Sequence, residues 1–112
     1  MTNEKYQYMA RRTQPEYANN IQMLINGAMG LCGESGEVCD IIKKYAYQGH
    51  DLSKFAIINE LGDVLWYIAL LCDALDTNIS DVMEKNIIKL KTRYPNGKFE
   101  SEKSRNRTDE SM

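Results

Sequence analysis

The chain has 112 residues, of which 43% are hydrophobic and 27% charged, a composition typical of one soluble folded domain and too apolar for a disordered chain. A formal net charge of -2 excludes the diffuse positive field by which proteins bind bulk nucleic acid or anionic membranes. Three cysteines without a CxxC pair argue against a disulfide framework and favour a cytoplasmic protein, and the longest apolar stretch, residues 64–72, is too short to cross a bilayer.

Helical periodicity dominates the chain, and no long alternation of apolar and polar residues predicts a strand. We expect a short helix over residues 4–12 and a long second helix through residues 21–42, with Pro15 in its first turn. A turn at residues 48–51 leads to a third helix, for which Ser53 is the predicted N-cap, and Ser80 is expected to cap a fourth that ends before residues 95–97. The fold class is therefore all-α, with a helical hairpin at its centre.

The last residues differ in composition from the rest. Between residue 100 and the terminal Met112 there is no apolar side chain. Burial of apolar surface therefore cannot compensate for the conformational entropy that this segment would lose on ordering. We expect residues 1–99 to form one helical domain and residues 100–112 to form a disordered tail.

Two acidic motifs of similar form lie on the second and third predicted helices. Glu34 and Glu37 form an ExxE motif, and Glu60 and Asp63 form an ExxD motif. Residues three apart lie about 60° from one another on a helix, so both carboxylates of a pair can reach one point. An antiparallel hairpin would bring the pairs together into one site of four carboxylates.

Clustered carboxylates repel one another, and bound cations are the natural remedy. Oxygen ligands without His or Cys favour Mg²⁺, with Mn²⁺ as the other candidate. The competing interpretation is that these acids are solvated surface charges, but two matched motifs make this less plausible. Gly36 and Gly62, one inside each motif, indicate either close helix approach or space for a ligand.

These motifs, together with the segment at residues 86–95 that reads N-x-x-K-L-x-x-R-Y-P, resemble the MazG-like nucleotide pyrophosphohydrolases of the all-α NTP pyrophosphatase superfamily. The resemblance covers roughly residues 21–99. It implies a four-helix-bundle-like fold completed by oligomerisation, with Mg²⁺ held by Glu34, Glu37, Glu60 and Asp63. It also implies hydrolysis of a (deoxy)nucleoside triphosphate to the monophosphate and pyrophosphate.

Other residues are assigned with the help of this resemblance. Glu34 and Glu37 are predicted to be catalytic, with Glu37 accepting the proton of the attacking water. The substrate is expected to contact one lysine on the second helix, one tyrosine on the third and three polar residues on the fourth, namely Lys44, Tyr67, Asn86, Lys89 and Arg93. Trp66 points elsewhere on the helical wheel and is expected in packing or an interface, and His50 is expected to be an ordinary turn residue.

The third helix also predicts an oligomer. Trp66 and Leu70 lie opposite Leu61 and Leu65, so apolar residues nearly encircle it, which favours a homodimer or homotetramer. Three alternative functions stay open. They are a phosphoribosyl-ATP-type pyrophosphohydrolase, a di-iron oxidoreductase, which would need Glu-x-x-His pairs that the chain lacks, and a non-catalytic helical interaction module with a vestigial metal site.

Overall fold

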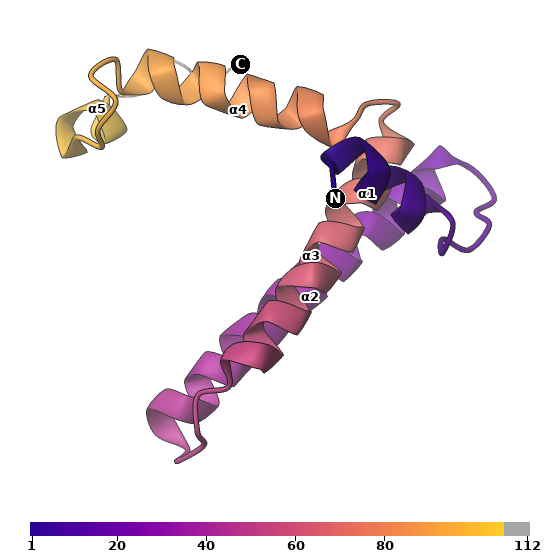
Figure 1. The fold of residues 1–112 in the computed structure, drawn as a ribbon, viewed down its shortest axis with the longest axis horizontal. Coiled ribbons are helices and arrows are strands. Elements are labelled where there is room, and N and C mark those ends of the chain that lie inside the picture. The colour runs from indigo at the N-terminus through magenta and orange to yellow at the C-terminus, as the bar shows by residue number, and fades with distance from the viewer. Residues whose placement is uncertain (107–112) are drawn as a thin grey trace. The chain divides into compact units, whose positions relative to one another are not determined.

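The structure is a computed structural model, and it describes residues 1–106. Within that range there are five helices and no strand, which confirms the all-α prediction: α1 (Asn3–Arg11), α2 (Asn20–Tyr47), α3 (Lys54–Ala74), α4 (Ile79–Arg93) and α5 (Ser101–Arg105). The chain divides into two compact units, Met1–Ile79 and Ser80–Met112 (Figure 1).

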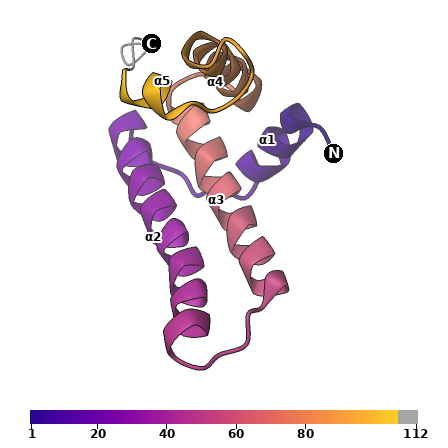
Figure 2. The same ribbon diagram turned by 90° about the vertical axis from the view of Figure 1, so that its left-hand side faces the viewer.

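Helices α2 and α3 are the framework of the first unit, and they lie side by side and antiparallel (Figure 2). Side chains fix where each begins. The Asn19 side chain accepts a hydrogen bond from the backbone N–H of Gln22, and the Ser53 hydroxyl accepts one from the N–H of Ala56. The predicted Ser53 cap is confirmed, whereas the placement of Pro15 in the first turn of α2 is wrong, because the Asn19 cap starts that helix five residues later at Asn20.

Two glycines of α2 allow α3 to approach closely. A Cβ atom at Gly27 would lie 2.7 Å from the Leu71 side chain, and one at Gly30 would collide with the Tyr67 ring. Gly36 and Gly62 have open space around them, so close helix approach at those two positions is not observed within the subunit.

Helix α1 is attached to the C-terminal end of α3 by polar contacts around one carboxylate. Asp73 accepts hydrogen bonds from the Gln7 amide (2.9 Å), the Gln14 amide (2.8 Å) and the Arg11 guanidinium (2.7 Å). Gln7, which is itself buried, also accepts a bond from the backbone N–H of Ile79. These contacts join residues more than 50 positions apart. They determine which face of α3 is covered by α1.

This placement shows which side of α3 is covered within the subunit. Leu70 is fully buried and Trp66 is half-buried, so the side of α3 that carries these two residues is covered within the subunit. The exposed apolar residues of α3 instead include Ile58, Leu61 and Leu65, which are about half exposed. The side of α3 that carries Leu61 and Leu65 is therefore the one open to a partner, and the oligomer itself stays a prediction.

Among the described helices, α3 alone is long and apolar enough to cross a membrane, which the short run at residues 64–72 did not suggest. Core helices of soluble proteins share this length and composition. Helix α3 also carries Glu60, Asp63 and Asp73, and carboxylates are costly inside a bilayer. That the protein does not bind membranes stays a prediction.

The second unit contains most of α4 and all of α5. Helix α4 begins at Ile79, one residue before the predicted cap Ser80, and the rings of Tyr94 and Phe99 pack with centroids 5.4 Å apart. Helix α5 forms within the segment predicted to be a disordered tail, and residues 107–112 of that segment lie outside the described residues.

Candidate functional site

Three carboxylates from α2 and α3 converge in the first unit. Glu34 comes from α2, and Glu60 and Asp63 come from α3; one oxygen of each lies within 4.8 Å of the others. The i, i+3 spacing puts both α3 acids on one face, and the antiparallel packing of α2 brings Glu34 opposite them. Glu34 and Glu60 are half-buried, while Asp63 is exposed.

The electrostatics of Glu60 show that this cluster is short of positive charge. A shared hydrogen bond with Glu34, then burial and the charges of Glu34 and Asp63, raise the pKa of the Glu60 carboxyl above its usual value. Its Oε2 atom is buried and has no hydrogen-bond partner among the described residues. A cation between the three carboxylates would satisfy this atom and relieve the repulsion. The oxygen-only donors suit a hard divalent ion such as Mg²⁺ or Mn²⁺.

The fourth predicted ligand, Glu37, does not lie in this cluster. It is exposed on α2, where its charge contributes to raising the pKa of Lys44, after the larger effect of Asp40. Lys44, predicted to contact a phosphate, bonds Asp40 at 2.9 Å on the same helix, and Lys43 bonds Asp40 at 3.2 Å. The structure thus brings together three of the four predicted ligands, and the roles of Glu37 and Lys44 stay predictions.

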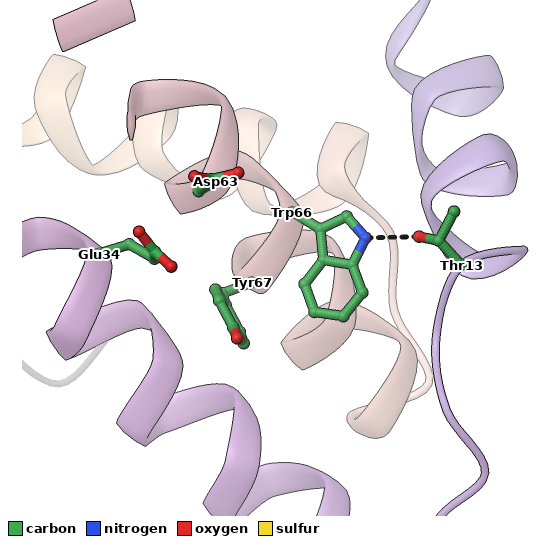
Figure 3. Close-up of a pocket in the computed structure, with 5 residues that line it drawn as sticks. All are labelled: Thr13, Glu34, Asp63, Trp66 and Tyr67. Atoms are coloured by element: carbon green, nitrogen blue, oxygen red, sulfur yellow. Dashed lines mark hydrogen bonds between the residues drawn. The ribbon is translucent and has the colours of Figure 1, made fainter. Parts of the chain in front are cut away.

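A pocket of about 390 Å³ opens beside the carboxylates, lined by Thr13, Glu34, Asp63, Trp66 and Tyr67 (Figure 3). This volume lies within the range of small-molecule sites, roughly 300–1,000 Å³. Acidic groups form one part of the lining and aromatic rings another, an arrangement suited to a ligand with a metal-bound polyanionic end and a flat apolar end. Tyr67, a predicted substrate contact, lines this pocket.

Two lining residues were missed by sequence reasoning. Trp66 was assigned to packing or an interface, yet it lines the pocket, and its indole N–H donates a 2.7 Å hydrogen bond to the Thr13 hydroxyl. No local pattern singles out Thr13, which lies 53 residues away in the link between α1 and α2. The sequence offered one general indication of this contact. A tryptophan N–H that is not fully solvated usually has a hydrogen-bond partner.

A third residue near the acids, Tyr6 on α1, was also missed. Its hydroxyl donates a long hydrogen bond of 3.5 Å to the backbone carbonyl of Gly62. Burial, and after it the charge of Asp63, raise the pKa of Tyr6 above its usual value. The phenol therefore stays protonated beside the carboxylates at neutral pH.

The remaining predicted substrate contacts lie on α4. Asn86 and Lys89 line one hollow of the second unit together with Val82, and the Arg93 guanidinium lies 5.9 Å from the centroid of the neighbouring Tyr94 ring. Asn86 is exposed, whereas Lys89 and Arg93 are half-buried. Their contact with a substrate stays a prediction.

The contact between the Tyr67 ring and Gly30 of α2 gives a direct test of the pocket. We expect Gly30→Ala to lower the free energy of unfolding by about 1–2 kcal/mol, because overpacking against the Tyr67 ring outweighs the better helix propensity of alanine. Gly33→Ala is the matched control on the same helix, where the new methyl meets open space and should stabilise by up to about 1 kcal/mol. Urea denaturation followed by circular dichroism measures both. Equal stabilisation by the two substitutions would show that Tyr67 does not lie against Gly30.

Comparison with known proteins agrees with this site. Residues 24–98, well over half of the chain, match the MazG nucleotide pyrophosphohydrolase domain, and this range contains all three clustered carboxylates. The chain is also 35% identical over 83 residues to the Gene 37 protein of Mycobacterium phage L5, an alignment that covers 70% of this chain and 73% of that protein. No solved structure matches significantly. By sequence and by its acidic hairpin, the chain belongs to the MazG nucleotide pyrophosphohydrolase domain family.

Proposed function

We propose that the protein is a Mg²⁺-dependent nucleotide pyrophosphohydrolase that cleaves a (deoxy)nucleoside triphosphate to the monophosphate and pyrophosphate. The observation that carries the proposal is the cluster of Glu34, Glu60 and Asp63, with the buried and unpartnered Oε2 of Glu60, beside a pocket lined by two aromatic rings. Family membership gives the same class of reaction.

The residues have distinct tasks in this reaction. Glu34, Glu60 and Asp63 would hold Mg²⁺, or Mn²⁺ in its place, with Glu37 as a fourth ligand once its side chain turns inward. When bound, the metal neutralises triphosphate charge and polarises the phosphorus that is attacked. From a position beside the metal and not between its other ligands, Glu37 would also accept the proton of the attacking water, with Glu34 as the other catalytic carboxylate.

Five further residues are proposed to contact the substrate. Tyr67 offers an aromatic face to the nucleoside, and Lys44, Asn86, Lys89 and Arg93 offer positive charge or hydrogen bonds to the phosphates. We favour deoxynucleotides, especially pyrimidine ones, because of the resemblance to small single-domain members. Phosphoribosyl-ATP is the alternative substrate for the same chemistry.

We also propose that the active form is a homodimer or homotetramer in the cytoplasm, in which α2 and α3 of two copies complete a four-helix-bundle-like core. The exposed apolar residues of this hairpin include Ile25 and Met29 on α2 and Ile58, Leu61 and Leu65 on α3. Burial of such a face is the usual reason for helical subunits to associate. The cytoplasmic location is proposed because the three cysteines are free thiols, the state in which a reducing compartment keeps them.

The test is a substrate panel. Purified protein is incubated with Mg²⁺ and each of the eight common ribo- and deoxynucleoside triphosphates, plus phosphoribosyl-ATP, and the products are separated by ion-exchange chromatography. We expect monophosphate and pyrophosphate from at least one substrate, with the product lost in Glu60→Gln. Diphosphate and phosphate as products would show that a different bond is cleaved. No product from any substrate would favour the non-catalytic interaction module.

A further inference from the structure

The aromatic part of the pocket wall is built in layers. The Tyr67 ring lies directly on the α2 backbone at Gly30, where no side chain intervenes. The Trp66 ring packs edge-on against Tyr67, with centroids 4.9 Å apart and planes at 82°. Tyr67 is therefore held on one side by α2 and on the other by Trp66, and its position depends on where the indole is fixed.

Thr13 fixes the indole with a hydroxyl whose hydrogen-bonding direction is determined. The Thr13 Oγ1–H donates to the carbonyl oxygen of Ala10 (2.7 Å), so the same oxygen can only accept from the Trp66 N–H, also at 2.7 Å (Figure 3). An indole N–H can only donate, so the Trp66 N–H and the Thr13 oxygen can form their hydrogen bond in this direction alone. This bond sets the Trp66 ring plane at the edge of the pocket.

Thr13 is in turn held by α1. Its backbone N–H bonds the Ala10 carbonyl at 3.0 Å, and Arg11 and Gln14 on either side bond Asp73 of α3. Ala10, Arg11, Thr13 and Gln14 all precede residue 24, where the match to the family domain begins. The N-terminal segment thus supplies a pocket residue from outside the matched domain.

From these contacts we propose that Thr13 is a positioning residue for the nucleoside part of the substrate, acting through the Trp66 and Tyr67 rings. The inference rests on the proposed function in that it takes the bound ligand to be a nucleotide. The carboxylates, and not Thr13, bind the polyphosphate end through the metal. Loss of the Thr13 hydroxyl should therefore weaken binding of the nucleoside and leave binding of the phosphates intact.

The experiment compares Thr13→Val, which keeps the shape and removes the hydroxyl, with Thr13→Ser, which keeps the hydroxyl. Trp66 is the single tryptophan of the chain, so intrinsic fluorescence reports this side chain alone. We would record the emission of each protein and its quenching by the α,β-methylene analogues of dCTP, dTTP and dATP with Mg²⁺. We would also measure KM and kcat for the triphosphate that the wild type cleaves fastest, with inorganic tripolyphosphate as a competitor that lacks a nucleoside.

We expect Thr13→Val to shift the Trp66 emission and to raise KM and the analogue Kd about 3- to 10-fold, the effect of losing one hydrogen bond. The kcat and the inhibition constant of tripolyphosphate should stay unchanged, and Thr13→Ser should behave as the wild type. A general structural defect would instead lower kcat and weaken tripolyphosphate binding as well.

The outcomes separate this inference from the proposed function. Hydrolysis by the wild type with an unchanged KM in Thr13→Val overturns the role of Thr13 and leaves the function standing. A Thr13→Ser variant as impaired as Thr13→Val overturns it too. If the wild type hydrolyses nothing but the analogues quench Trp66, and this quenching is weaker in Thr13→Val only, the role of Thr13 in nucleoside binding is supported and hydrolysis is not.

Discussion

We expect the Glu60→Gln variant to be more heat-stable than the wild type in EDTA and yet at least about 100-fold slower in triphosphate hydrolysis with Mg²⁺. The two effects have one cause. Three carboxylates with oxygens within 4.8 Å of one another repel when no cation lies between them. The hydrogen bond with Glu34 contributes most to raising the pKa of Glu60, and burial and the charges of Glu34 and Asp63 raise it further. Glutamine keeps the shape of the side chain and removes its charge.

The gain in stability and the loss of activity are therefore linked through the metal. In the wild type, Mg²⁺ should raise the melting temperature in a concentration-dependent manner, because an ion that binds only the folded state stabilises it by mass action. In Glu60→Gln that rise should be small, since one ligand is missing and the site carries less charge. Differential scanning fluorimetry in EDTA and across a Mg²⁺ titration measures both, with Mn²⁺ as the second ion.

Glu102→Gln is a suitable control, because it removes the same charge from an exposed position on α5, outside the family match. It should change neither the metal-free melting temperature nor the response to Mg²⁺. A wild type that Mg²⁺ does not stabilise, or a Glu60→Gln variant that melts below the wild type in EDTA, would contradict a metal site at these carboxylates.

The parts of this site that were predictable depend on short-range geometry. Glu60 and Asp63 share a helix face because they are three residues apart, and that relation holds wherever the helix packs. Glu34 joins them because the turn before Ser53 forces α2 and α3 to run antiparallel. Glu37 shows the limit of such reasoning: its spacing allows it to point at the cluster, but the exposed side chain does not join it.

The parts that were missed depend on contacts between distant segments. A helical wheel of α3 correctly separates Trp66 and Leu70 from Leu61 and Leu65, but it does not say which side is covered. The answer comes from α1, which is held to α3 by Asp73 and Gln7 through bonds between residues 66 positions apart. The role of Gly30 could not be predicted from the sequence either. This glycine leaves room for the ring of Tyr67, which lies 37 positions further along the chain.

The second large effect should come from Asp73→Asn, which we expect to lower the free energy of unfolding at pH 7 by about 2–3 kcal/mol. The Asp73 side chain is only 8% exposed, and it accepts bonds from Arg11, Gln7 and Gln14. An asparagine in its place has one acceptor oxygen and no charge, so some of these donors lose their partner. The expected loss is smaller than that for breaking a fully buried ion pair, because the Arg11 side chain is 57% exposed.

Because α1 also carries the segment that bears Thr13, the same substitution should affect the pocket. Loosening α1 at Asp73 should increase the accessibility of Trp66 to acrylamide, although the two residues do not bond each other. Asp51→Asn, at an exposed position in the turn between α2 and α3, is the matched control and should change neither stability nor accessibility. If the Asp73→Asn variant has the same free energy of unfolding as the wild type, the polar contacts around Asp73 do not hold α1 in place.

The pH dependence provides a check that does not rely on the size of the mutational effect. Burial raises the pKa of Asp73, but the hydrogen bonds from Arg11, Gln7 and Gln14 and the charge of Arg11 outweigh it, so the folded pKa lies below the ordinary value of 3.8. A carboxyl with a depressed folded pKa stabilises the protein above its unfolded pKa, and this stability is lost as the pH falls through the folded value. The difference in unfolding free energy between wild type and Asp73→Asn should therefore be constant above about pH 5 and shrink at lower pH. Other acids, including Glu60, titrate equally in both proteins and cancel in this difference. A difference that stays constant down to the acid limit of urea titrations would mean that the charge of Asp73 is not what holds α1 to α3.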